Sequence, residues 1–193
     1  MEEVVINVHE TKQVHLAEQL HRLPESFTAC FITRINNYQD TVADTLKYLT
    51  QERKECGIYI STTRSYKPLV EYLASRGIDS TKLLVIDMIP DRIEIYDGPA
   101  NCLKMPVPSS LTELSMVILE SSAMSQAKFV FFDSVNSFLT YNETQTVEMF
   151  FAFMLNKLRE SNVAGLGVSL SSMYPDEGLD RIYRLFDRRI EVE

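Results

Sequence analysis

Polar and charged side chains follow several β-rich apolar runs in this sequence, at the points where the predicted strands end. Arg34 follows the first run, Arg64 the second, and Asp133 a later one. In a parallel sheet, ligands bind at the carboxyl ends of the strands, so chemistry is expected here. Guanidinium groups grip phosphates without a dedicated loop, so the two arginines could hold an anion. A lone carboxylate is a weaker signal, because it can equally accept hydrogen bonds from neighbouring strand-end amides. The hydroxyls expected nearby are Thr33, Thr41, Thr62, Thr63 and Ser134.

The elements that must position these side chains are typical of an α/β fold. Short apolar runs alternate with longer amphipathic segments, which predicts a mostly parallel central sheet with helices on both faces. The expected strands are residues 27–33, 58–61, 83–89, 129–133, 163–170 and 189–192, with 91–97 as a short additional strand. The expected helices are residues 41–54, 68–77, 110–123, 142–158 and 179–186, with Asn142 as a helix cap.

Composition sets the class of protein. The chain has 193 residues, 45% apolar and 24% charged, with a formal net charge of -8. This predicts one domain over residues 1–193, with residues 1–23 as a partly helical extension. No apolar stretch reaches the roughly 18 residues of a membrane span, and the acidic start lacks signal-peptide features. We therefore expect a soluble, cytoplasmic protein without a membrane partner.

Two further classes of site are disfavoured by residue type and spacing. The acidic balance makes a nucleic-acid partner unlikely, because phosphate neutralisation requires clustered Lys and Arg. The histidines His9, His15 and His21 recur every six residues, which does not align them on one helix face as a metal pair requires. The three cysteines are widely spaced, so neither a zinc site nor a redox pair is expected.

Three stretches of the chain follow one another in a recognisable order: Phe27–Leu49, Gly57–Ser61 with the helix to Gly77, and Phe129–Ser134. Their order resembles the RecA superfamily of P-loop ATPases, and more closely its archaeal-type KaiC-like branch. The resemblance runs from about Leu23 to the C-terminus, and residues 136–158 also resemble the KaiC-like branch. The resemblance implies a three-layer fold, a magnesium-associated position for Asp133 and assembly through the faces that flank the nucleotide site.

The phosphate-binding loop of that family is poorly matched in this chain. The loop needs two glycines, so that backbone amides wrap the phosphates, and a lysine that neutralises them. Of the positions that this pattern fixes, only the last, a serine or threonine, is matched, by Thr41. A unit charge about 4 Å from a phosphate is worth on the order of 4 kcal/mol at an effective dielectric near 20. An aspartate in the lysine position therefore repels the phosphate by a similar amount. The corresponding window is Arg34-Ile35-Asn36-Asn37-Tyr38-Gln39-Asp40-Thr41.

Two further observations bear on the same site. Asp40 is also a favoured N-cap residue, and with Asp44 it would satisfy the positive end of the following helix without any phosphate. The catalytic acidic pair that the resemblance implies falls on Thr63 and Arg64, neither of which is a general base at neutral pH.

These observations predict a catalytically inactive RecA/KaiC-like domain that acts as a regulatory or protein-interaction module without a cofactor. The alternative is residual binding of a nucleotide or anion, such as ATP with Mg²⁺, and weak ATPase activity around Arg34, Arg64 and Asp133. Recombinase-like nucleic-acid binding and acyl transfer are less favoured, because the sequence offers no basic groove and no Gly-x-Ser-x-Gly motif.

A protein partner or a homo-oligomer is the expected form of interaction. Met149 and Phe153 flank the apolar stripe of the helix over residues 142–158 and widen it beyond what one sheet requires. The simpler expectation is that the N-terminal segment or the last helix covers both side chains. If they are exposed, they mark an interface.

Overall fold

The computed structural model describes residues 16, 18–24, 26–89, 99–105, 110–171 and 176–192. Within these ranges, seven strands form one sheet in the order β4-β3-β2-β5-β6-β1-β7, and every neighbouring pair is parallel. The strands are β1 Thr28–Thr33, β2 Gly57–Ser61, β3 Leu83–Asp87, β4 Cys102–Lys104, β5 Phe129–Asp133, β6 Ala164–Leu170 and β7 Arg188–Val192.

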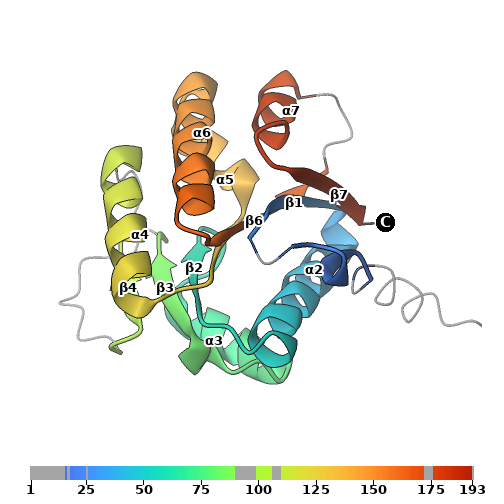
Figure 1. Cartoon of the computed structure of the whole chain (residues 1–193), viewed down its shortest axis with the longest axis vertical. Coiled ribbons are helices and arrows are strands. Elements are labelled where there is room, and N and C mark those ends of the chain that lie inside the picture. Colours follow the sequence, from blue (N-terminus) through green and yellow to red (C-terminus); the bar gives the residue numbers. More distant parts are fainter. Residues whose placement is uncertain are drawn as a thin grey trace, which may run out of the picture.

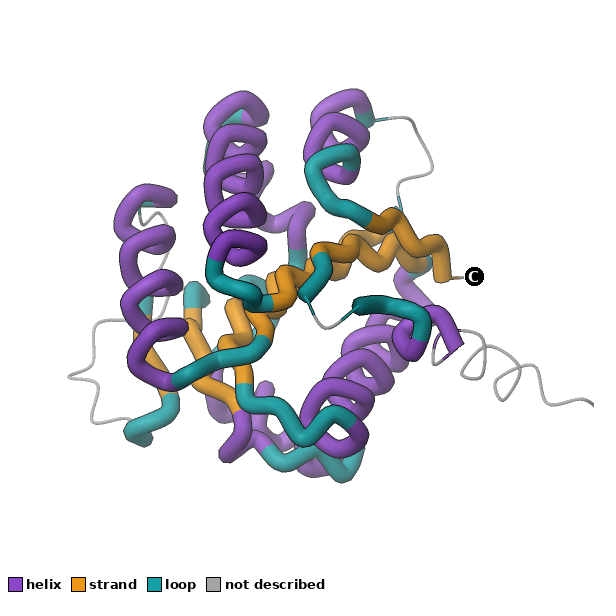
Figure 2. The backbone as a smooth tube through the Cα atoms, in the orientation of Figure 1, coloured by secondary structure: helices purple, strands orange, loops and turns teal. Residues whose placement is uncertain are grey.

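Helices cover both faces of this sheet and give a three-layer α/β arrangement (Figures 1 and 2). On one face lie α2 Ile35–Lys47, the π-helical turn η1 Tyr48–Glu52 and α3 Tyr66–Ser75, with the short 3₁₀ turn η2 Ser80–Lys82 leading into β3. On the other face lie α4 Leu111–Ser125, α5 Val135–Tyr141, α6 Thr144–Glu160 and α7 Glu177–Tyr183. The expected fold class is therefore confirmed.

The two layers of core follow from the alternation of side chains along each strand. In β5, Phe129 and Phe131 join the apolar cluster beneath α2 and α3, whereas Val130 and Phe132 join the cluster beneath α4 to α7. All four side chains are fully buried. A strand buried on both faces needs a continuous apolar run, which is why this segment was recognisable from its sequence.

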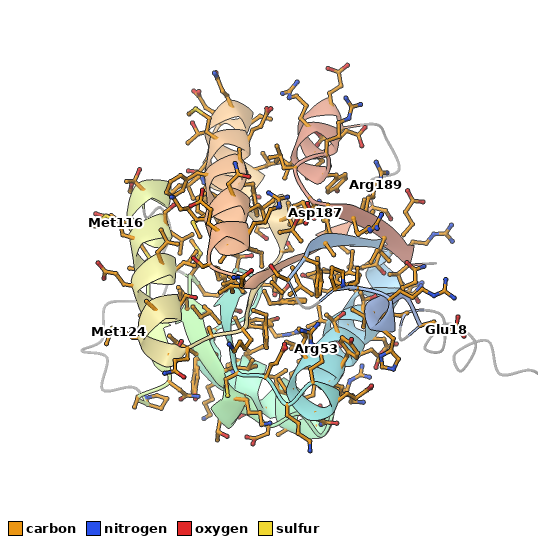
Figure 3. The ribbon with its side chains drawn as sticks, viewed as in Figure 1. Glu18, Arg53, Met116, Met124, Asp187 and Arg189 are labelled. Carbon is orange, nitrogen blue, oxygen red and sulfur yellow. The ribbon has the colours of Figure 1, made fainter. Side chains whose placement is uncertain are left out.

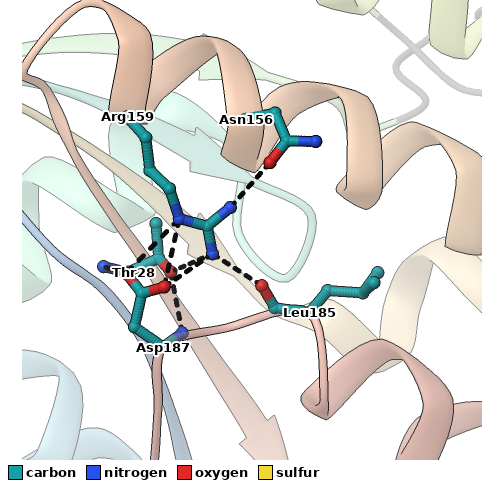
Figure 4. Close-up of polar contacts among 5 residues, drawn as sticks. All are labelled: Thr28, Asn156, Arg159, Leu185 and Asp187. Carbon is teal, nitrogen blue, oxygen red and sulfur yellow. Dashed lines mark hydrogen bonds and ion pairs between the residues drawn. The ribbon is translucent and has the colours of Figure 1, made fainter.

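Arg159 ties three elements together at the edge of the sheet where β1 and β7 begin (Figure 4). Its guanidinium group donates to Thr28 Oγ1 at 2.9 Å, to the carbonyl of Leu185 at 2.7 Å and to Asp187 Oδ1 at 2.9 Å. It also donates to Asn156 Oδ1 at 3.0 Å. Thr28 and Asp187 exchange two further bonds, so the last strand is fixed to the first.

Two capping predictions are wrong. The helix expected from Thr41 begins at Ile35, so Asp40 lies inside α2 and its carboxylate pairs with Arg76 at 2.7 Å instead of capping the helix. Asn142 ends α5, and α6 begins after Glu143, because residues 135–141 form a short helix of their own. The short helix α5 and the edge strand β4 were not predicted. The additional strand expected at 91–97 lies outside the described residues, as does most of the expected 1–23 extension.

Candidate functional site

Asp133, at the end of β5, is a fully buried carboxylate that accepts hydrogen bonds from three hydroxyl groups. Tyr38 Oη donates to its Oδ1 atom, and Tyr59 Oη donates to its Oδ2 atom. Thr63 Oγ1 also donates to Oδ2, at 3.0 Å. The donors come from α2, from β2 and from the loop after β2, so the carboxylate joins three segments. Its predicted partners were strand-end amides, but the structure supplies hydroxyl groups.

The electrostatics of this cluster keep the phenols protonated. Burial raises the pKa of both tyrosines, and the nearby Asp133 carboxylate raises it further. Burial also raises the pKa of Asp133 above its ordinary value, against the opposing effect of the three hydrogen bonds and of the Arg64 charge. The tyrosines therefore act as hydrogen-bond donors at neutral pH, and both carboxylate oxygens are engaged within the protein.

Tyr38 reaches Asp133 because α2 starts directly after β1. Arg34 alone connects the strand to the helix, and the amide of Asn37 already bonds the Arg34 carbonyl at 3.0 Å. The Tyr38 side chain is 7% exposed and belongs to the apolar cluster beneath α2. Thr41, buried in the same helix, donates to the Asn37 carbonyl at 2.9 Å. The segment expected to bend around an anion is thus helical from Ile35 onward.

Arg64 follows β2 and turns toward α3. Its guanidinium carbon lies 4.3 Å from the centre of the Tyr72 ring, a cation–π contact. The Tyr72 hydroxyl donates to the carbonyl of Gln39 on α2, so α3 also contacts the first helix. Arg64 Nη1 is buried and has no hydrogen-bond partner among the described residues.

The structure does not bring Arg34 and Arg64 together as the sequence analysis expected. Their strands, β1 and β2, are separated in the sheet by β5 and β6. Three strand spacings amount to roughly 14 Å. Arg34 is exposed, as are Asn36 and Gln39.

The remaining polar groups at the strand ends, Thr62 and Ser134, form hydrogen bonds within the protein. The Asp133–Ser134 peptide bond is cis, and the Ser134 amide donates to Thr62 Oγ1 at 2.8 Å. The Thr62 amide in turn donates to the Asp133 carbonyl at 2.7 Å. The Ser134 hydroxyl lies 2.9 Å from the hydroxyl of Ser137 on α5.

Sequence reasoning missed the two tyrosines. Tyr59 lies in β2 between Ile58 and Ile60 and pairs in register with Phe131. The sequence did carry a signal for this contact: a tyrosine at a predicted core position usually needs a hydrogen-bond partner for its hydroxyl group.

A second feature lies on the opposite face of the sheet, between α4 and α6. An apolar groove of about 350 Å³ is lined by Met116 and Leu119 from α4 and by Met149, Phe150 and Phe153 from α6. Met149 is 60% exposed and Phe153 is 46% exposed. We expected the N-terminal segment or the last helix to cover these two side chains. The last helix does not, because α7 contacts α6 on another side, through Arg181 and Glu148, and most of the N-terminal segment lies outside the described residues.

Two other classes of site are not found among the described residues. No group of three or more His, Cys, Asp or Glu side chains in these ranges is placed to hold a metal ion. No described helix combines the length and apolar character needed to cross a membrane.

Comparison with known proteins adds evidence on the fold. No family model matches this chain, and no curated protein matches it. Among solved structures, it is similar to a KaiC-like protein of the hyperthermophilic archaeon Pyrococcus horikoshii OT3, with a TM-score of 0.64 and 16% sequence identity. The similarity covers 88% of this chain and 72% of that chain. The chain therefore has a KaiC-like fold.

Proposed function

We propose that this chain is a catalytically inactive KaiC-like domain that acts as a regulatory or protein-interaction module. The observation that carries the proposal is the use of Asp133 within the protein. The family resemblance implies that the Asp133 carboxylate would bind Mg²⁺ beside a nucleotide. Its two oxygens, however, already accept hydrogen bonds from Tyr38, Tyr59 and Thr63. A metal or its waters would have to displace the buried hydroxyl groups of Tyr38 and Tyr59, which would then lack a partner.

The residues around Asp133 also fit a triphosphate poorly. A phosphate-binding loop needs free backbone amides, whereas residues from Ile35 onward are helical. The position of the phosphate-binding lysine is held by Asp40, which pairs with Arg76. Thr63 and Arg64 stand where the family resemblance implies the catalytic acids, and neither side chain is a general base at neutral pH. ATP with Mg²⁺ therefore does not fit these residues, and we derive no step of hydrolysis through it.

The interaction role is supported by the exposed groove between α4 and α6. Met149 and Phe153 are large apolar side chains on the surface, and such patches mark contact sites more often than single exposed residues do. The partner is a second copy of the chain or another protein.

Isothermal titration with ATP and Mg²⁺, together with a phosphate-release assay, tests the proposal. The expected result is no saturable heat and no released phosphate. Low-micromolar binding or turnover by the purified chain would refute it.

A melting experiment tests the alternative of an anion site. If sulfate or phosphate raises the melting temperature and Arg64→Ala abolishes that rise, the strand ends bind anions and the proposal is wrong. Arg34→Ala is the matched control, because Arg34 lies in an exposed position beyond two intervening strands.

A further inference from the structure

The groove between α4 and α6 has a rigid floor and adaptable walls. Phe150, 5% exposed, forms the floor and packs against Phe138 and Phe151 at ring-centre distances of 5.5 and 5.2 Å. The walls are formed by Met116 and Met149, which are 57% and 60% exposed. Methionine side chains adjust their shape to different apolar surfaces, so these walls can pack against a row of apolar side chains from a partner.

The shape of the groove fits a helix. α4 and α6 lie side by side (Figure 1), and the groove is lined by residues 111–119 of α4 and 146–153 of α6, so it runs along about two turns of each helix. An amphipathic helix binds such a groove by inserting apolar side chains spaced three and four residues apart. Figure 3 shows that Met116 points away from the sheet, as does Met124 near the end of α4. The volume of about 350 Å³ leaves room for several aliphatic side chains.

The rim of the groove is acidic on one side. Glu113 precedes Met116 by three residues and Glu120 follows it by four, so both share its face of α4. Both are exposed, and neither forms an ion pair with another described residue. The whole chain carries a net charge of -8, which also attracts cations at longer range. A second copy would bring the same two carboxylates and the same net charge, so charge favours a different occupant.

We propose that this groove binds an amphipathic helix of another protein, with an apolar stripe inserted between Met116 and Phe153 and with Lys or Arg on the flank that meets Glu113 and Glu120. The inference rests on the proposed function as an interaction module and specifies the chemistry of its partner. It does not depend on the state of the strand-end site, because α4 and α6 cover the other face of the sheet from Tyr38.

The test uses the full chain labelled with ¹³C at the methionine methyl groups. The probe is a synthetic peptide of the length of α4, 15 residues, with leucines on one face and lysines on one flank. Saturable shifts of the Met116 and Met149 signals are expected. The signals of Met154, which is fully buried, and of Met124, which lies outside the groove lining, should stay unchanged.

Two control peptides test separately whether binding needs the apolar face and whether it needs the basic flank. A peptide of the same composition with its leucines spread around the helix should leave both signals unchanged. A peptide with glutamate in place of lysine should bind roughly 5- to 10-fold more weakly, as expected for two surface ion pairs. The double variant Glu113→Lys with Glu120→Lys should reverse that preference. These substitutions lie on exposed positions, and circular dichroism would verify that the variant folds.

Several outcomes would overturn the inference. They are binding that leaves Met116 and Met149 unmoved, equal binding of the scrambled peptide, or no preference between the lysine and glutamate peptides. Sedimentation that reveals a dimer which Phe153→Asp dissolves would assign the groove to a second copy. Titration with ATP and Mg²⁺ separates this inference from the proposed function, because nucleotide binding would refute the latter and leave the peptide result standing.

Discussion

Replacing Tyr38 with phenylalanine tests the central contact of the strand-end site. The substitution removes only the hydroxyl that donates to Asp133 and leaves the buried ring in place. A hydrogen bond to a charged acceptor contributes about 1.5 to 3 kcal/mol to stability, and one to a neutral acceptor about 1 kcal/mol. The loss should therefore depend on whether Asp133 is ionised.

The pH dependence follows from the direction of the Asp133 pKa. Burial raises this pKa above the ordinary value of 3.8, so the folded chain holds the proton more tightly than the unfolded chain. The stability that this proton confers is present at low pH and is lost as pH rises through the raised pKa. Removing the Tyr38 donor raises the pKa further, because the ionised form loses more than the neutral form does.

Urea unfolding of the wild type and of Tyr38→Phe measures both effects. At a pH above the raised pKa of Asp133 we expect a loss of about 2 kcal/mol, which lowers the urea midpoint by about 1 M. At the lowest pH at which the chain stays folded, we expect a loss of about 1 kcal/mol. Tyr66→Phe is the matched control, because the Tyr66 hydroxyl bonds a neutral acceptor, Asn101 Oδ1, at 2.8 Å. The control should lose the same amount at both pH values. A Tyr38→Phe loss that is absent or independent of pH would refute the reasoning.

Three further predictions concern the rest of the fold. Gly57→Ala should cost about 1 to 3 kcal/mol in urea unfolding, because the new Cβ would lie 2.4 Å from the buried ring of Phe129; an unchanged midpoint would contradict the packing. Arg159→Met should lower the unfolding free energy by about 1 to 2 kcal/mol near neutral pH. Burial raises the pKa of Asp187, but hydrogen bonds from Arg159 and Thr28 outweigh burial, so the pKa lies below its ordinary value. The part of this stabilisation that comes from Asp187 is therefore lost as pH falls through that lowered pKa, and an Arg159→Met loss of unchanged size in strong acid would argue against the pairing. Of the three thiols, only Cys56 is exposed, so a thiol reagent should titrate one group rapidly in the native chain and all three in denaturant.

The fold was predictable where a local pattern determined the element. The strand at 129–133 was assigned with its observed bounds, because a strand covered on both faces requires a continuous apolar run. The short helix α5 was missed because its seven residues are too few for a clear period of 3.6. Asn142 has the side chain of a helix cap but bonds the carbonyl of Phe138, at the end of the preceding helix.

The candidate site was only partly predictable. Asp133 was located correctly, but its donors depend on where α2 begins, and two signals favoured a later start. Asp40 has a strong preference for the N-cap position, and the family resemblance called for a loop before it. Tertiary contacts outweigh both, since an earlier start buries Tyr38 beside Asp133 and places Asp40 against Arg76.

The single-residue passage from β1 into α2 also restricts how nucleotide binding could be engineered into this chain. Introducing glycine at Arg34 and Gln39 and lysine at Asp40 would reproduce the spacing of a phosphate loop, yet the lysine would lie within the second turn of a helix. One interior glycine weakens a helix by only about 1 kcal/mol, which does not unwind a segment anchored by its buried face. Grafting would need extra residues inserted after Thr33.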